Sequence, residues 1–250
     1  MTKEEIYKQL VERRKACFFC REFGMKNQAE FPHYDTQEIG NLTTWSNNLR
    51  SKILIVGQDF YHQNGFLAQH GQVQFGEELS GTDDKKGYST KTNYYLKTLI
   101  DHLLEEFRLS PPRNDGKNSN NPLFLTNAVL CLKSGNASSK IEEKCYSNCA
   151  TKFLDPLINM LKPELKVIIT LGKPAALSVL SIFEKKAANL VNLRTHSMNE
   201  LLAKSYIKVS DSEPAIFMLY HPSRFHLNRS FVDHVNDWLK VKDYIINIST

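Results

Sequence analysis

Apolar residues gather in four short runs along the chain, and each run ends in glycine or polar residues. The runs are KILIVG (52–57), PLFLTNAVLC (122–131), LKVIITLG (165–172) and PAIFMLYHPS (214–223). Continuous apolar runs of this length are typical of strands that are buried on both faces of a sheet. The pattern therefore predicts four buried strands.

Helical spacing of apolar residues appears before, between and after these runs. Residues 2–15 predict a helix, because Thr2 and Glu5 match a capping box and Ile6 and Leu10 recur at helical spacing. Further helices are predicted over residues 92–107, 146–161, 173–183 and 230–245. Residues 21–48, most of 58–90 and 111–121 are polar or rich in turn-forming residues, which indicates loops.

Strands that alternate with helices predict a parallel sheet with helices on both faces. We expect one α/β domain over residues 1–250, a three-layer α/β/α sandwich with a central, mainly parallel four-stranded sheet. In such sheets ligands bind at the carboxyl ends of the strands. The polar segments that follow the strands, GQDFYH (57–62), TN (126–127), GK (172–173) and HPSRF (221–225), should therefore meet at one edge.

The composition indicates the class of protein and its compartment, but it says little about the reaction that the protein performs. The 250 residues are 41% hydrophobic and 24% charged, as in an ordinary globular protein. No apolar stretch reaches 18 residues and the N-terminus has no apolar signal core, so we expect a cytosolic monomer that does not enter membranes. The net charge of +5 is compatible with a polyanionic partner but does not require one.

Three strand ends carry side chains that suit cleavage of a nucleoside. Asn127 presents an acceptor and two donors to a base edge, and His221 can donate to an oxygen that gains charge. Asp59 can stabilise an oxocarbenium-like sugar and hold a water. The chain has no G-x-S-x-G elbow, P-loop or G-x-G-x-x-G turn, so hydrolase-triad and nucleotide-binding interpretations are weak.

The chain contains five cysteines, Cys17, Cys20, Cys131, Cys145 and Cys149. An odd number without a secretory signal argues against a disulfide framework. A C-x-x-C pair together with distant cysteines favours a metal or iron–sulfur site. Zinc and free thiols remain the alternatives.

Four of these motifs resemble the uracil-DNA glycosylases. GQDFYH is similar to the family's GQDPYH, with Phe60 in place of proline, while LTNAVL and HPSRF resemble LLLNAVL and HPSPL. TNAVLC and KPELKVIITLGKPAA resemble TNVVKC and KPxVIVALGxxAA of the iron–sulfur enzymes. The chain thus combines two subfamilies. It departs from both over residues 62–90, and it has Gln58-Asp59 where the iron–sulfur enzymes carry a Glu in a GExPG loop.

The resemblance implies a monofunctional glycosylase that acts on DNA containing uracil, with water as nucleophile. Asn127 would pair with the uracil edge, and neutral His221 would donate to O2 of the base. Backbone amides near Gln58 would assist, and Asp59 would stabilise the sugar cation. The plainer alternatives are that Asp59 caps a turn and that Asn127 bonds to backbone.

Further binding residues follow from the same resemblance. Tyr61 would exclude the thymine methyl, and Phe75 would stack on the base, with Phe66 and Tyr88 as alternatives. Candidate DNA contacts are His62, Lys173 at a helix N-terminus, Ser223, Arg224 and Phe225, the last as a wedge that fills the space of the flipped base. For Phe225 and Lys173, ordinary packing and a plain strand–helix turn are the alternatives.

The resemblance also implies a [4Fe–4S] cluster on Cys17, Cys20, Cys131 and Cys149, with a structural role. Cys131 lies four residues after Asn127, as the cysteine of TNVVKC does. The fourth ligand is a choice between Cys145 and Cys149, and CATKFLDPLINMLKP resembles the segment that follows the family's last ligand, which favours Cys149.

Two other functions stay open at this point. One is a DNA-binding module that captures damaged bases without cutting them. The other is a glycosylase for another base, such as hypoxanthine or mismatched thymine, although Tyr61 disfavours thymine.

Overall fold

The structure is a computed structural model. It describes residues 1–31, 39, 48–59, 96, 98–100, 103, 123–136, 139–184, 187–222 and 229–248. Within this part of the chain, no helix is long and apolar enough to cross a membrane.

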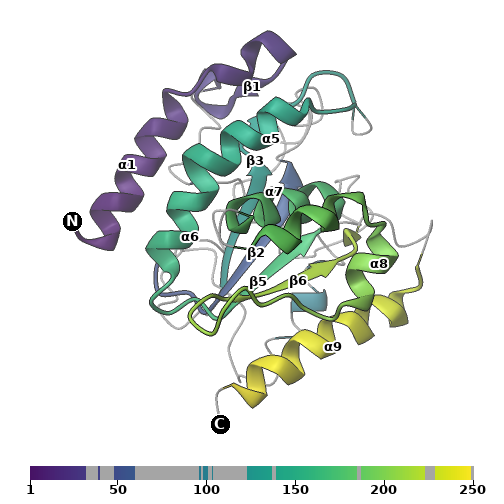
Figure 1. Cartoon of the computed structure of the whole chain (residues 1–250). Coiled ribbons are helices and arrows are strands. Elements are labelled where there is room, and N and C mark those ends of the chain that lie inside the picture. Colours follow the sequence, from purple (N-terminus) through teal and green to yellow (C-terminus); the bar gives the residue numbers. More distant parts are fainter. Residues whose placement is uncertain are drawn as a thin grey trace.

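A four-stranded parallel sheet forms the centre of the fold (Figure 1). Its strands are β2 (Ile53–Asp59), β3 (Leu123–Val129), β5 (Val167–Leu171) and β6 (Ala215–Leu219). Their order is β3-β2-β5-β6, and every neighbouring pair is parallel. The predicted sheet is therefore confirmed, although the fourth apolar run ends as a strand at Leu219 rather than at Ser223.

Alternate residues of each strand enter two different cores. On β2, Leu54 and Val56 join one core while Ile53 and Ile55 join the other. The first core contains α1 (Lys3–Lys15), α5 (Glu143–Cys149), α6 (Asp155–Leu161) and α7 (Lys173–Phe183). The second contains α9 (Phe231–Asn247) and helical residues between 96 and 103. This confirms the three-layer α/β/α arrangement.

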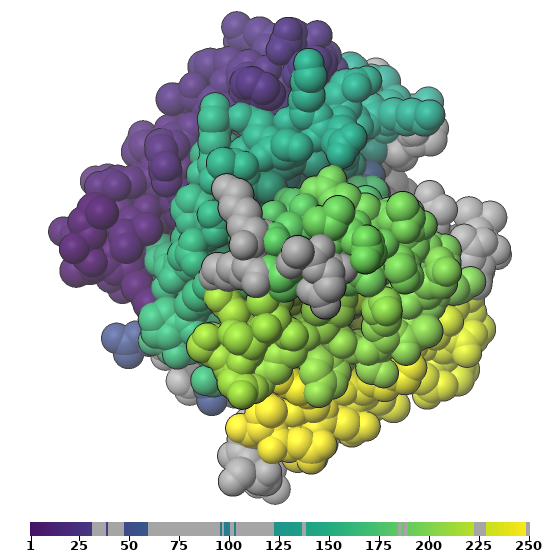
Figure 2. Space-filling view, viewed as in Figure 1, coloured from purple at the N-terminus to yellow at the C-terminus, as the bar shows by residue number. Residues whose placement is uncertain are grey.

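The N-terminal segment is more structured than its sequence suggested. After α1, whose Thr2–Glu5 capping box is present, come two 3-10 turns, η1 (Phe19–Phe23) and η2 (Gln28–Glu30), with β1 (Lys26–Asn27) between them. Strand β1 pairs antiparallel with β4 (Cys131–Leu132), which follows β3 almost directly. The N-terminal segment therefore lies at the carboxyl end of β3 and contacts α5. Figure 2 shows its purple surface beside the teal part of the chain.

A buried side-chain amide holds this chain reversal in place. Asn27 Nδ2 donates to the carbonyl oxygens of Arg14 at 2.6 Å and Cys17 at 2.7 Å. The first carbonyl belongs to the last turn of α1, where the helix supplies no further donors, and it also accepts the Cys17 N–H at 3.1 Å. The amide therefore satisfies the end of the helix and directs the chain toward β1.

Other helices differ from the pattern in specific ways. The helix predicted over 146–161 begins at Glu143 and is interrupted by a π-helical turn, η6 (Ala150–Leu154), just before Pro156. Proline has no N–H to donate to the preceding turn, which favours such an interruption. The turn η7 (Ala188–Thr195) and the helix α8 (Met198–Ala203) were not predicted; α8 begins at a Ser197–Glu200 capping box.

Candidate active site

The described residues of the polar segments predicted to meet share one edge of the sheet. Because all four strands are parallel, their carboxyl ends lie on the same side. Asp59 ends β2, Asn127 lies near the end of β3, and Lys173 begins α7 directly after β5. His221 follows β6 by two residues.

Asn127 lies directly against the backbone of the neighbouring strand. Its register partner on β2 is Gly57, and only 6% of its surface is exposed. A Cβ placed on Gly57 would stand 2.4 Å from Asn127 Oδ1, which is closer than real Cβ atoms come to other heavy atoms. The glycine therefore makes room for the amide, and this is a physical reason for the Gly in GQD.

The Asp59 carboxylate is largely buried and is held by two side chains. Its Oδ2 accepts a hydrogen bond from Gln58 Nε2 at 2.9 Å and pairs with Lys133 Nζ at 3.1 Å. The side chains of Lys133 and Asp59 are only 6% and 12% exposed. Sequence reasoning missed Lys133; the only signal was a single cation in the apolar segment beyond β3.

Tyr146, on α5, completes the surroundings of this carboxylate. Its phenol lies close to the Gln58 side chain. Burial, and then the negative charge of Asp59, raise the pKa of Tyr146 above its ordinary value. The phenol therefore stays protonated beside the carboxylate. No pattern along the chain had indicated this residue.

His221 lies at the turn between β5 and α7. Gly172 adopts a φ of 88°, which strains any residue with a side chain, and its N–H donates to the Leu219 carbonyl at 2.7 Å. A Cβ on Gly172 would stand 3.4 Å from the Cβ of His221. This turn therefore places His221 beside Gly172, the residue that precedes α7.

Several predicted site residues lie outside the described residues. These are Tyr61, His62, Phe66, Phe75, Tyr88, Ser223, Arg224 and Phe225. Their roles stay predictions.

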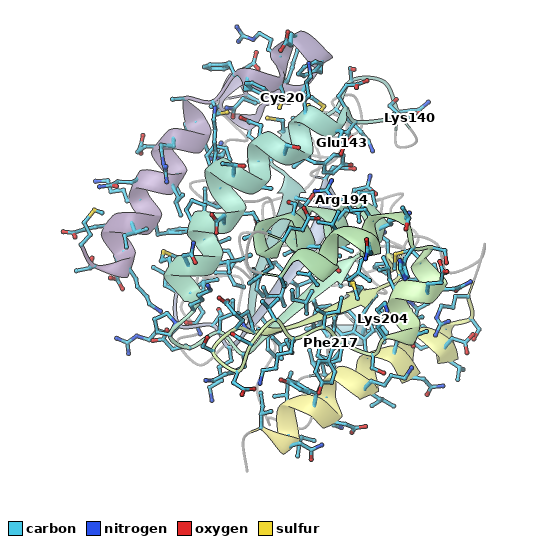
Figure 3. The ribbon with its side chains drawn as sticks, in the orientation of Figure 1. Cys20, Lys140, Glu143, Arg194, Lys204 and Phe217 are labelled. Atoms are coloured by element: carbon cyan, nitrogen blue, oxygen red, sulfur yellow. The ribbon has the colours of Figure 1, made fainter. Side chains whose placement is uncertain are left out.

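The structure brings all five cysteines to one place. Cys20, at the meeting of η1 and α5 (Figure 3), lies close to both Cys149 and Cys145. The pKa of Cys20 is lowered to about 7, and the neighbouring Cys149 is the largest cause. Burial raises the pKa of Cys131, which also interacts electrostatically with Cys20 and Cys17.

Thiol side chains are the right kind of ligand for a thiolate-bound metal, but within the described residues their arrangement does not form a metal site. Thiolates are the ligands that iron–sulfur clusters and structural zinc prefer. Yet no group of three or more His, Cys, Asp or Glu side chains within the described ranges stands ready to hold a metal ion. The residues are thus appropriate in kind and in neighbourhood, and the choice between Cys145 and Cys149 stays open because both contact Cys20.

An exposed surface of aromatic and basic residues flanks the cysteines. Phe18 and Phe19 are 45% and 44% exposed. The Arg21 guanidinium lies 4.5 Å from the centre of the Phe18 ring, and Lys152 Nζ lies 5.2 Å from that of Phe19. We call the set Phe18, Phe19, Arg21, Phe23, Lys144 and Lys152 the aromatic–basic surface.

A family model described as the uracil DNA glycosylase superfamily matches residues 45–240. The chain belongs to this superfamily. No curated protein matches it. The match spans all four strand ends of this DNA glycosylase and three of its cysteines, but it leaves Cys17 and Cys20 outside.

Proposed function

We propose that the protein is a monofunctional uracil-DNA glycosylase of base-excision repair, which hydrolyses the N-glycosidic bond of uracil flipped out of DNA. One observation carries the proposal. Asn127 of β3 lies in the space left by Gly57 of β2, and Asp59 follows Gly57 by two residues on β2. A base-reading amide and a carboxylate for the sugar are thus held on adjacent strands in a superfamily of this chemistry.

The proposed reaction divides the work among these groups. Asn127 pairs with the uracil edge, and the flipped base enters at the carboxyl edge of the sheet. The bond between C1′ and N1 breaks, its electron pair goes to the base, and His221 donates a hydrogen bond to the oxygen that gains charge. Asp59 stabilises the sugar cation while water adds at C1′, and the proton that this water loses neutralises the released uracil anion. Tyr61 excludes the thymine methyl.

The remaining predicted residues contact substrate in this proposal. Phe75 stacks on the uracil, and Phe225 fills the space that the base leaves in the helix. His62, Lys173, Ser223 and Arg224 contact the DNA backbone.

Uracil release tests the proposal directly. The protein is incubated with single- and double-stranded oligonucleotides that contain one uracil, and abasic sites are then cleaved with alkali. The matched control substrate carries thymine at the same position, and Asp59→Asn is the control variant. Cleavage at uracil alone is expected. Tight binding without release would favour a base-capturing module, and release of hypoxanthine alone would favour a different base.

We further propose that Cys17, Cys20, Cys131 and Cys149 hold a [4Fe–4S] cluster. Three segments that are distant in sequence bring these thiols together: the end of α1 with η1, β4 and α5. When bound, the cluster would supply a cross-link among these segments. Anaerobic purification should give a brown protein that absorbs near ~400 nm and contains about four irons per chain. Zinc in place of iron, or a colourless metal-free protein, would contradict the cluster.

The aromatic–basic surface supports DNA as the partner. It lies at the end of the molecule where β1 pairs with β4, beyond the carboxyl end of β3. Exposed aromatic rings stack on bases, and cations beside them neutralise phosphates. We propose that DNA beyond the flipped nucleotide crosses this surface, so that the cysteine site orders a DNA-facing region.

A further inference from the structure

The Asp59 carboxylate is bound asymmetrically. In the described part of the chain, both hydrogen bonds that this carboxylate accepts go to Oδ2, one from Gln58 Nε2 and one from Lys133 Nζ. Oδ1 is therefore the oxygen that can face a water or the sugar. A carboxylate fixed at one oxygen cannot rotate without losing both donors.

Lys133 is a costly residue to bury unless it pairs with a charge. Only 6% of its side chain is exposed, and an ammonium group removed from water needs a charged or hydrogen-bonding partner. Within the described part of the chain, its Nζ pairs with the Asp59 carboxylate at 3.1 Å. The two residues are 74 positions apart in sequence, so the tertiary fold alone creates the pair.

The segment that carries Lys133 is itself held firmly. Lys133 follows β4, which is paired with β1 through Lys26↔Leu132 and Asn27↔Cys131. On the other side, Tyr146 of α5 lies close to Gln58, the second donor to Asp59. The carboxylate is thus supported from two elements, β4 and α5, that also carry Cys131 and Cys145.

We propose that Lys133 is a positioning residue for the glycosylase reaction. It holds Oδ2 of Asp59 so that Oδ1 is presented to the reacting sugar, and it does not contact the substrate itself. The inference rests on the proposed role of Asp59. A misplacement of a reacting group by about 1 Å costs on the order of 10²-fold in rate, which sets the expected effect of releasing the carboxylate.

The test compares Lys133→Met with Lys133→Arg. Single-turnover uracil release is measured at saturating enzyme, and affinity is measured with DNA that carries a non-hydrolysable deoxyuridine analogue. Lys133→Met should lower the rate roughly 10²-fold and leave the affinity nearly unchanged. Lys133→Arg, which keeps a cation for Oδ2, should recover most of the rate. Lys133→Gln serves if the methionine variant does not fold.

A matched control lies at the opposite edge of the sheet. Lys162 pairs with the buried Glu213 at 2.8 Å, and these residues precede β5 and β6 respectively. Lys162→Met removes an ion pair of the same kind, so it should lower the unfolding midpoint and leave uracil release unchanged. Equal rate losses in both variants would show a general loss of stability and would overturn the inference.

A double-mutant cycle shows whether Lys133 acts through Asp59. In an Asp59→Asn background, Lys133→Met should have no further effect on the rate. A further loss of rate in the Asp59→Asn background would mean that Lys133 contacts DNA directly. A covalent DNA adduct that borohydride traps in the wild type but not in Lys133→Arg would mean the same. Normal release by Lys133→Met overturns this inference alone. A wild-type protein that releases no uracil overturns the proposed function as well.

Discussion

Replacement of Gly57 by alanine should slow base excision because the new Cβ would clash with a single atom. An alanine Cβ at this position would stand 2.4 Å from Asn127 Oδ1, whereas its next neighbours, Asn127 Cγ at 3.6 Å and the Thr126 carbonyl oxygen at 3.7 Å, are at ordinary contact distances. The backbone therefore accepts alanine, and only the amide must move. Real Cβ contacts begin at 3.0 Å and become ordinary at 3.4 Å, so Asn127 Oδ1 must retreat by about 0.6 Å (3.0 − 2.4) to 1.0 Å (3.4 − 2.4).

A shift of this size in an amide that binds the base should lower the catalytic rate strongly. Misplacement by about 1 Å costs on the order of 10²-fold, so Gly57→Ala should lower single-turnover uracil release by roughly that factor. The fold should persist, since Gly57 lies in a strand at a φ that other residues adopt. Circular dichroism and the unfolding midpoint check this.

The control for Gly57→Ala removes the atom that the new methyl group would strike. In an Asn127→Ala background, Gly57→Ala should cost little further activity, because Oδ1 is gone. A wild-type rate in Gly57→Ala would refute the placement of Asn127 in the pocket. A loss of the same size in the Asn127→Ala background would refute the steric explanation.

Three further predictions concern other parts of the molecule. Asn127→Ala and His221→Ala should each lower uracil release by roughly 10²–10³-fold without changing the unfolding midpoint, and a near-normal rate in either would place the pocket elsewhere. Cys149→Ser should lose iron on anaerobic purification while Cys145→Ser keeps it, and the opposite result would make Cys145 the fourth ligand. Lys152→Gln should weaken binding to DNA of any sequence and reduce the slope of log affinity against log salt by about 1, with an unchanged slope excluding Lys152 from the DNA contact.

Much of the fold could be predicted because it depends on local pattern. The apolar runs gave the four strands, helical spacing gave most of the helices, and alternation of strand and helix gave a parallel sheet with one functional edge. The Thr2–Glu5 capping box, likewise a local signal, was confirmed. The π turn at Ala150–Leu154 was not predicted, because helical periodicity does not distinguish a one-turn irregularity.

Candidate site residues could be identified by type and place, but their partners could not. Asp59, Asn127 and His221 follow apolar runs, so their position at the sheet edge was evident from the sequence. Lys133 and Tyr146 belong to segments without such a signal, and their importance comes from contact with Asp59 and Gln58.

The sequence by itself thus determined which elements form and which edge of the sheet carries the chemistry, since periodicity and strand ends are properties of neighbouring residues. Only the tertiary structure decided that Asn127 lies against Gly57, that Lys133 binds Asp59 across 74 positions, and that Cys145 joins the other four cysteines. These contacts depend on strand register and on how β4 and α5 pack beside β2 and β3. The residue pattern within one segment does not specify which distant segment packs beside it.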